Sequence, residues 1–141
     1  GLMNLKSRFF PVLLLTGALL LLSACQEKRT ESYYYAHPET LKTFLHQCLN
    51  DGGTPATFNV PCAVAYNAAV QMTQLSQAFI NNQADFGQRI LHSQIRVVDT
   101  SKQLDFAEKA QLPVAELKKQ LANEKQLVNN LRAIVGLFIR I

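Results

Sequence analysis

Apolar residues recur at steps of three and four over much of the chain after residue 37, which is the spacing of one face of a helix. The first such segment is residues 38–49, and it opens with Pro38, a residue favoured at the first helical position. Residues 50–53 (NDGG) end it, because glycine accepts the left-handed conformation that closes a helix. The apolar face of this predicted helix consists of Leu41, Phe44, Leu45 and Cys48.

A longer helical pattern covers residues 62–109. Its first half carries one apolar stripe, made of Ala65, Ala68, Met72, Leu75, Phe79 and Phe86. The stripe then drifts through Ile90, Leu91, Ile95, Val97, Val98 and Leu104. Such a drift indicates either a long curved helix or a break. The two weak points are Asn81–Asn82 and residues 99–101 (DTS), so we expect any interruption at one of them.

A further helix is predicted from Pro113, with Glu116 in its first turn. Its apolar seam has heptad spacing, interrupted only where Glu124 takes one position, and consists of Val114, Leu117, Leu121, Val128, Leu131, Val135 and Phe138. With residues 110–112 as the connection, the two long helices are expected to fold back as an antiparallel hairpin. The alternative that buries both seams is dimerisation.

The end of the chain, residues 133–141, is apolar nearly all round but too short to span a bilayer. The hairpin seam accounts for one stripe of it. Leu137 and Ile141 lie off that seam, so we predict that these two residues, with Phe138, contact a partner: another protein, a second copy or the membrane interface.

The first 24 residues have the pattern of a lipoprotein signal peptide. Lys6 and Arg8 precede an apolar stretch at residues 9–22, which is shorter than the roughly 20 residues of a membrane span. Residues 22–25 (LSAC) fit a lipobox, so Cys25 is the predicted lipidation site. An ordinary secretory signal with a chance cysteine is the alternative. Because Gln26 rather than Asp follows the cysteine, outer-membrane sorting is favoured over retention in the inner membrane.

Cysteine usage predicts a disulfide. With Cys25 lipidated, Cys48 and Cys62 remain as an even pair in an oxidising compartment. A bridge between them joins the short helix to the long one. The less favoured alternative is a metal site that uses His46 with the two thiols, and we expect no metal and no other cofactor. The predicted fold is therefore all-α: a short N-terminal helix disulfide-linked to a long antiparallel helical hairpin.

Between the lipobox and the first helix, residues 25–32 are predicted to be a lipidated tether and residues 33–141 a single helical domain. Tyr34 and Tyr35, within a run of three tyrosines, either lie at the lipid headgroups or pack on a neighbouring helix, and packing is favoured. His37 is predicted to cap the helix that Pro38 begins, a structural role rather than a catalytic one.

Charge and motifs argue against two classes of function. The formal net charge is +4, and it falls to +2 once Lys6 and Arg8 leave with the signal; without a clustered basic face, nucleic-acid binding is not supported. The three histidines are scattered, and the sequence holds no hydrolase, zincin or phosphate-loop motif. We therefore expect a protein that is not an enzyme.

Part of the chain resembles a known family. The segment at residues 34–38 (YYAHP), the leucine-spaced helix, and the cysteines at 48 and 62 around a loop with glycine and proline occur in order behind a lipobox. In this the chain resembles the EexN-type lipoproteins, which are assigned to entry exclusion in conjugative type IV secretion loci. The resemblance covers residues 25–69, whereas the helical extension over residues 70–141 departs from it.

The resemblance implies a membrane-anchored periplasmic lipoprotein that binds an envelope or transfer-channel protein. The alternative is a structural lipoprotein subunit of an outer-membrane secretion or envelope complex. A small periplasmic enzyme or an enzyme inhibitor is the least favoured interpretation. The membrane, through acyl chains on Cys25, and either an envelope protein or a second copy are the expected partners.

Overall fold

The computed structural model describes residues 29–139, so the predicted signal peptide, the first half of the predicted tether with Cys25, and Ile141 lie outside the described residues. Within this range every regular element is a helix, which confirms the all-α prediction. The helices are α2 (Glu31–Ala36), α3 (Pro38–Asn50), α4 (Val60–Asn81), α5 (Gln83–Lys109) and α6 (Ala115–Phe138). None of them is both long and apolar enough to cross a membrane.

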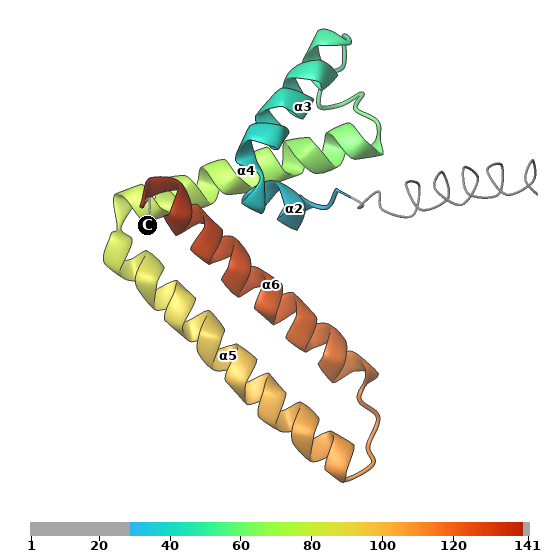
Figure 1. Ribbon diagram of the computed structural model, residues 1–141, viewed down its shortest axis with the longest axis vertical. Helices are drawn as coiled ribbons and strands as arrows, with labels where there is room; N and C mark the ends of the chain where they lie inside the picture. The colour runs from blue at the N-terminus through green and yellow to red at the C-terminus, as the bar shows by residue number, and fades with distance from the viewer. Residues whose placement is uncertain (1–28, 140–141) are drawn as a thin grey trace, which may run out of the picture.

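The helices form two arms that meet at an elbow. Figure 1 shows α3 and α4 in one arm and α5 beside α6 in the other, with α2 in the angle between the arms and the end of α6 near the elbow. The last turn of α4 and the first turn of α5 make the bend. Because α2 contacts α3, α4 and α6, it holds the two arms together.

The elbow forms at Asn82. This residue has an extended backbone, and its side chain accepts a hydrogen bond from the Asp85 N–H, so it caps α5 where α4 ends. Of the two predicted weak points, Asn81–Asn82 is confirmed. Residues 99–101 lie inside α5 without interruption. The helix that runs beside α6 is consequently α5 alone, whereas the predicted long helix also included α4.

Helix α2 was not predicted. Thr30 accepts a hydrogen bond from the Tyr33 N–H, which caps the helix, and Glu31 stands in its first turn, where the helix dipole favours a negative charge. The helix therefore takes in Glu31 and Ser32, which were assigned to the tether. The polar composition of residues 26–32 concealed this capping sequence.

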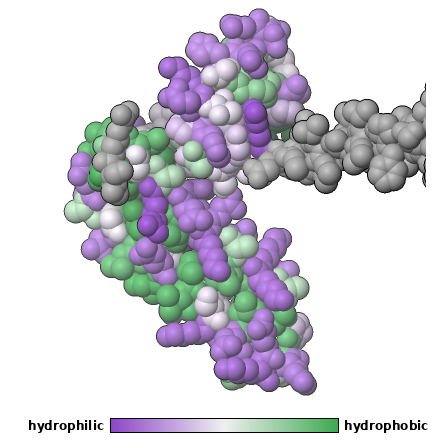
Figure 2. Space-filling view, in the orientation of Figure 1, coloured by the Kyte–Doolittle hydropathy of each residue, from purple (hydrophilic) through white to green (hydrophobic). Residues whose placement is uncertain are grey.

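The α5–α6 pair packs through a seam that is partly polar. On α5 the inward residues follow alternating steps of four and three, and Ser93 and Thr100 are buried among them: Phe86, Ile90, Ser93, Val97, Thr100, Leu104 and Ala107. Leu91, Ile95 and Val98 lie on a second face and are about half exposed. The drift in the sequence pattern is therefore not a break in α5, which runs without interruption from Gln83 to Lys109. It records two apolar faces, and Figure 2 shows hydrophobic residues along this arm.

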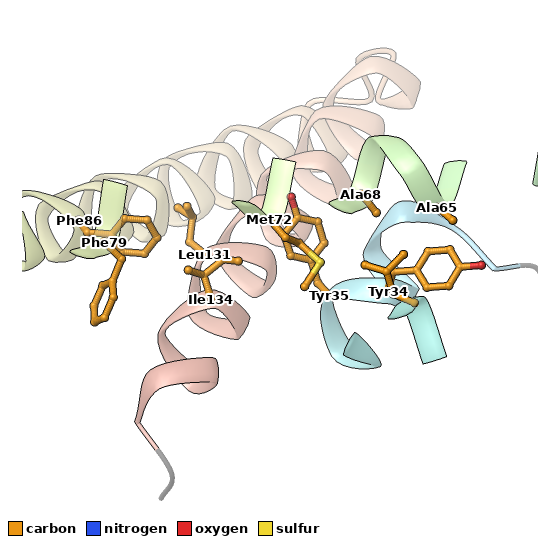
Figure 3. Packing of buried hydrophobic residues seen from close by; sticks show 10 residues of the cluster. Tyr34, Tyr35, Ala65, Ala68, Met72, Phe79, Phe86, Leu131 and Ile134 are labelled. Carbon is orange, nitrogen blue, oxygen red and sulfur yellow. The ribbon is translucent and has the colours of Figure 1, made fainter. Parts of the chain in front are cut away.

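The main hydrophobic core lies where α2, α4 and α6 meet, close to the elbow. Figure 3 shows Tyr34 beside Ala65 and Phe79 beside Phe86, with side chains of α6 between these two groups. Ile134 of α6 is completely buried although it lies off the predicted seam, because α6 faces α2 and α4 as well as α5. Phe138, which the seam includes, is 45% exposed.

Candidate functional site

The predicted disulfide is present. Cys48 in α3 and Cys62 in the first turn of α4 are bonded, with their Cα atoms 6.0 Å apart. Closing a loop of this length stabilises a fold by roughly 3 kcal/mol in the chain-entropy model. The bridge consumes both thiols, so neither is free to bind a metal. Within residues 29–139 the structure holds no cluster of three or more potential metal ligands.

The loop under the disulfide depends on Gly53. Its N–H donates a hydrogen bond to the Cys48 carbonyl, and a Cβ at this position would lie 2.8 Å from that oxygen and 2.9 Å from the Phe58 ring. Any larger residue would have to push the loop away from the end of α3. Gly53 thus fixes the corner together with the disulfide, whereas the sequence indicated it only as part of the run that ends the helix.

Two of the three tyrosines pack into the core. Tyr34 and Tyr35 are both buried, as the favoured alternative predicted, and the Tyr35 hydroxyl donates a hydrogen bond to Gln71 Oε1 at 3.2 Å. Burial, and secondarily the nearby Glu31 carboxylate, raises the pKa of Tyr35 above its usual value. This motif therefore joins α2 to α4.

His37 lies between two helices and contacts the first of them. It occupies the cap position of α3, as predicted, but its side chain makes no capping bond there. Its Nδ1 instead lies 2.8 Å from the Tyr33 carbonyl oxygen, so the ring nitrogen donates, and the ring stacks on Tyr33 with centroids 4.0 Å apart. Together with Pro38, which begins α3, His37 sets the bend between α2 and α3.

Large apolar side chains are exposed at the elbow. Leu137, Phe138 and Ile139, at the end of α6, are 42–50% exposed, and Ile80, near the end of α4, is 54% exposed. Phe138 links the two helices, because its ring lies 5.0 Å from that of Phe79. We call these four residues the elbow surface. Of the predicted partner-binding residues, Leu137 and Phe138 belong to it, whereas Ile141 lies outside the described residues.

Two shallow hollows flank α6. One, of about 560 Å³, lies between α2 and α6 and includes Thr30, Tyr35 and Asn130 in its lining. The other, of about 370 Å³, lies between α5 and α6 and is lined mainly by apolar atoms of residues that include Val97, Val98 and Val128. The second hollow adjoins the exposed apolar face of α5, which consists of Leu91, Ile95 and Val98. The sequence analysis did not predict that this face is exposed. The signal for it was the second set of apolar residues at steps of four and three, at 91, 95 and 98.

Comparison with protein-family models, with curated proteins and with solved structures finds no match to this chain.

Proposed function

We propose that this chain is a lipid-anchored periplasmic protein of the cell envelope, that it is not an enzyme, and that it acts by binding another protein. The elbow surface carries the proposal. Ile80, Leu137, Phe138 and Ile139 are large apolar side chains that contact water at the bend between the two arms, an arrangement that marks binding sites. Burying a leucine or isoleucine is worth roughly 1.5–3 kcal/mol, so a partner that covers this surface gains substantially.

The anchor is the acylated Cys25. Two or more acyl chains hold a protein stably on a membrane, and each buried methylene contributes about 0.8 kcal/mol. Helix α2 begins at Glu31, so the connecting residues reach at most roughly 20 Å from Cys25. The folded part therefore works close to the membrane surface. Because Gln26 follows the lipidated cysteine, the favoured location is the periplasmic side of the outer membrane. The inner membrane is the alternative location.

The fold supplies two parts for this task. The short helix α3, fixed to α4 by the Cys48–Cys62 bridge, forms a corner at the start of α4. The pair of helices α5 and α6, which lie side by side, extends from the elbow (Figure 1). The elbow surface lies at the junction of these two parts, so a partner bound there contacts both arms.

Within this class we propose entry exclusion in a conjugative type IV secretion system: the protein docks on an envelope or transfer-channel protein and blocks it. The resemblance of residues 25–69 to EexN-type lipoproteins supports this role. Two features of the fold are consistent with this resemblance, because they give the matching positions structural roles. Cys48 and Cys62 form a disulfide, and Tyr34 and Tyr35 are buried in the core. A second candidate is a structural subunit of an outer-membrane secretion complex, which the projecting α5–α6 hairpin favours, because an extended arm suits bridging between subunits.

The test is a mating experiment. The conjugative element is the one whose transfer region encodes this protein. Its transfer frequency is measured into recipients that produce the wild-type protein, recipients that lack it, and recipients that produce the Cys25→Ser variant. Exclusion predicts reduced transfer only where the anchored protein is present. Equal transfer into all three recipients rejects exclusion, and loss of secretion-complex assembly in cells without the protein supports the structural role instead.

A further inference from the structure

A hollow of about 400 Å³ lies beside α3, close to the point where the predicted tether joins the fold. Its volume falls in the range of small-ligand sites, roughly 300–1,000 Å³. One lining residue, Arg29, precedes α2, and the others belong to α3: Glu39, Thr40, Thr43, Phe44 and Gln47. Five of these six side chains are polar, so the hollow is suited to a polar ligand. We call it the Arg29 hollow.

Two aromatic rings position the cationic side of the hollow. The Arg29 guanidinium lies 5.7 Å from the centroid of the Tyr33 ring and 6.0 Å from that of the Phe44 ring, and both rings attract it. Within residues 29–139 Arg29 takes part in no ion pair. Its N–H groups therefore stand ready for an acceptor from outside the fold. A guanidinium matches a phosphate best, because its planar fork donates two parallel hydrogen bonds.

The hollow also contains a carboxylate. Glu39 is exposed and, in the part of the chain that the structure describes, it forms no ion pair with Arg29 or with any other residue. Lys42 and His46, the other ionisable side chains of α3, do not line the hollow. The described lining thus carries one positive and one negative charge. A purely anionic ligand would be repelled by Glu39, whereas a zwitterion meets a complementary charge at both ends.

The position of the anchor indicates the source of such a ligand. Cys25 precedes Arg29 by four residues, so the two Cα atoms lie at most roughly 14 Å apart. With the acyl chains of Cys25 in the bilayer, as the proposed function has them, the Arg29 hollow lies within reach of the lipid headgroups. Of the zwitterionic headgroups, phosphocholine has no N–H group and is held by aromatic cages. Phe44, the one ring in the lining, already faces Arg29.

We propose that the Arg29 hollow binds the phosphoethanolamine headgroup of a membrane lipid. The phosphate accepts hydrogen bonds from the Arg29 guanidinium, and the primary ammonium donates to the Glu39 carboxylate and to the hydroxyls of Thr40 and Thr43. This inference rests on the lipid anchor of the proposed function. The acyl chains and the hollow then form two attachments, which fix the orientation of the α3–α4 arm on the membrane. A single tether would leave the folded part free to turn.

Titration with the free headgroup tests the hollow itself. The mature acylated chain, labelled with nitrogen-15 and held in micelles of non-ionic detergent, is titrated with glycerophosphoethanolamine. The amide signals of Thr40 and Thr43 should shift and saturate. Arg29→Gln and Glu39→Gln should each weaken binding by at least about tenfold, because each removes a charged hydrogen-bond partner. Lys42→Gln, an exposed position of α3 outside the hollow, is the matched control and should bind as the wild type does.

Two further ligands test the match to a primary ammonium. Glycerophosphocholine and glycerophosphoglycerol should both bind more weakly than glycerophosphoethanolamine. The proposal is overturned if no signal saturates, if all three compounds bind equally, or if Glu39→Gln leaves binding unchanged, since the hollow would then hold a phosphate alone. Arg29 and Glu39 are both exposed, so their variants should keep the melting temperature of the wild type. The titration measures neither exclusion nor transfer, so its failure leaves the proposed function standing.

Vesicles test whether a membrane lipid is the ligand. The chain contains no tryptophan, so Gln47→Trp places a single reporter in the lining of the hollow. Acrylamide should quench this reporter less in vesicles of phosphatidylethanolamine with a minor share of phosphatidylglycerol than in vesicles where phosphatidylcholine replaces the phosphatidylethanolamine. Adding Arg29→Gln should remove the difference, and Gln103→Trp, exposed on α5, should show none. Equal quenching of Gln47→Trp in both vesicles overturns the proposal even where the free headgroup binds, because the ligand is then a soluble phosphoester.

Discussion

Tyr35 shows how a single side chain connects the predicted motif to the fold. Its ring is buried between helices, and its hydroxyl reaches Gln71 of α4, so it ties α2 to the disulfide-bearing arm. The tyrosine cluster, His37 and Pro38 were all identified from the sequence. The hydrogen bond from His37 to the Tyr33 carbonyl could not be identified in this way, because a local sequence pattern does not show which of two adjoining helices a side chain contacts.

Burial of Tyr35 predicts a loss of stability at high pH. The pKa of Tyr35 is raised in the folded state. The contribution of Tyr35 to the free energy of unfolding is therefore fully present below the ordinary tyrosine pKa of about 10, and it is lost as the pH rises through the pKa of the folded state. Chemical denaturation at pH 9 and at pH 11 should show the free energy of unfolding falling by less in Tyr35→Phe than in the wild type. An identical fall in both proteins would show that burial of Tyr35 does not set this dependence.

At the scale of the element, the α5–α6 seam explains where prediction succeeded and where it stopped. The α6 seam was visible because most of its members are apolar. On α5 two seam positions are Ser93 and Thr100, and Thr100 is only 2% exposed. Gln120 of α6 donates a hydrogen bond to the Thr100 hydroxyl at 3.4 Å, which satisfies a polar group in the seam. A hydrophobicity pattern cannot reveal a seam whose members bury hydroxyl groups.

Glu124 is the weak point of this seam. Within the described residues its Oε1 atom is buried and has no hydrogen-bond partner. Glu124→Leu completes the apolar seam and removes an unsatisfied acceptor, so it should raise the free energy of unfolding by about 1 kcal/mol. Thermal denaturation measures the change. Asn123→Leu, at the exposed neighbouring position, is the matched control and should give no such gain. A destabilised Glu124→Leu would mean that this carboxylate has a favourable role in the hairpin.

At the scale of the whole molecule, the two arms depend on different forces. The α3–α4 arm is closed by the Cys48–Cys62 bridge, whereas the α5–α6 arm depends on its seam and on the core near the elbow. The helical class and the bridge were predictable, since helical periodicity and cysteine parity are local properties of the sequence. The bend at the elbow could be narrowed from the sequence only to one of two sites. The packing of α6 on α2 and α4, which buries Ile134, could not be predicted from the seam pattern, because Ile134 lies off the seam.

Opening the disulfide should therefore affect one arm more than the other. Replacing Cys48 and Cys62 by alanine is expected to lower the free energy of unfolding by roughly 3 kcal/mol. Hydrogen exchange should quicken mainly in α2, α3 and the loop before α4, while amides in the middle of α5 and α6 stay protected. Uniformly faster exchange over all helices would instead show that the arms unfold as one unit.

The central claim is that the anchored protein acts through the elbow surface, and the most direct measurement is transfer frequency into recipients that produce Leu137→Ser/Ile139→Ser. Both side chains are about half exposed, so their replacement should leave the circular dichroism spectrum and the melting temperature of the purified protein nearly unchanged. The account predicts that recipients with this variant, present in the membrane at the wild-type level, accept the element as readily as recipients without the protein. Exclusion as strong as that of the wild type, from a folded and anchored variant, would contradict it.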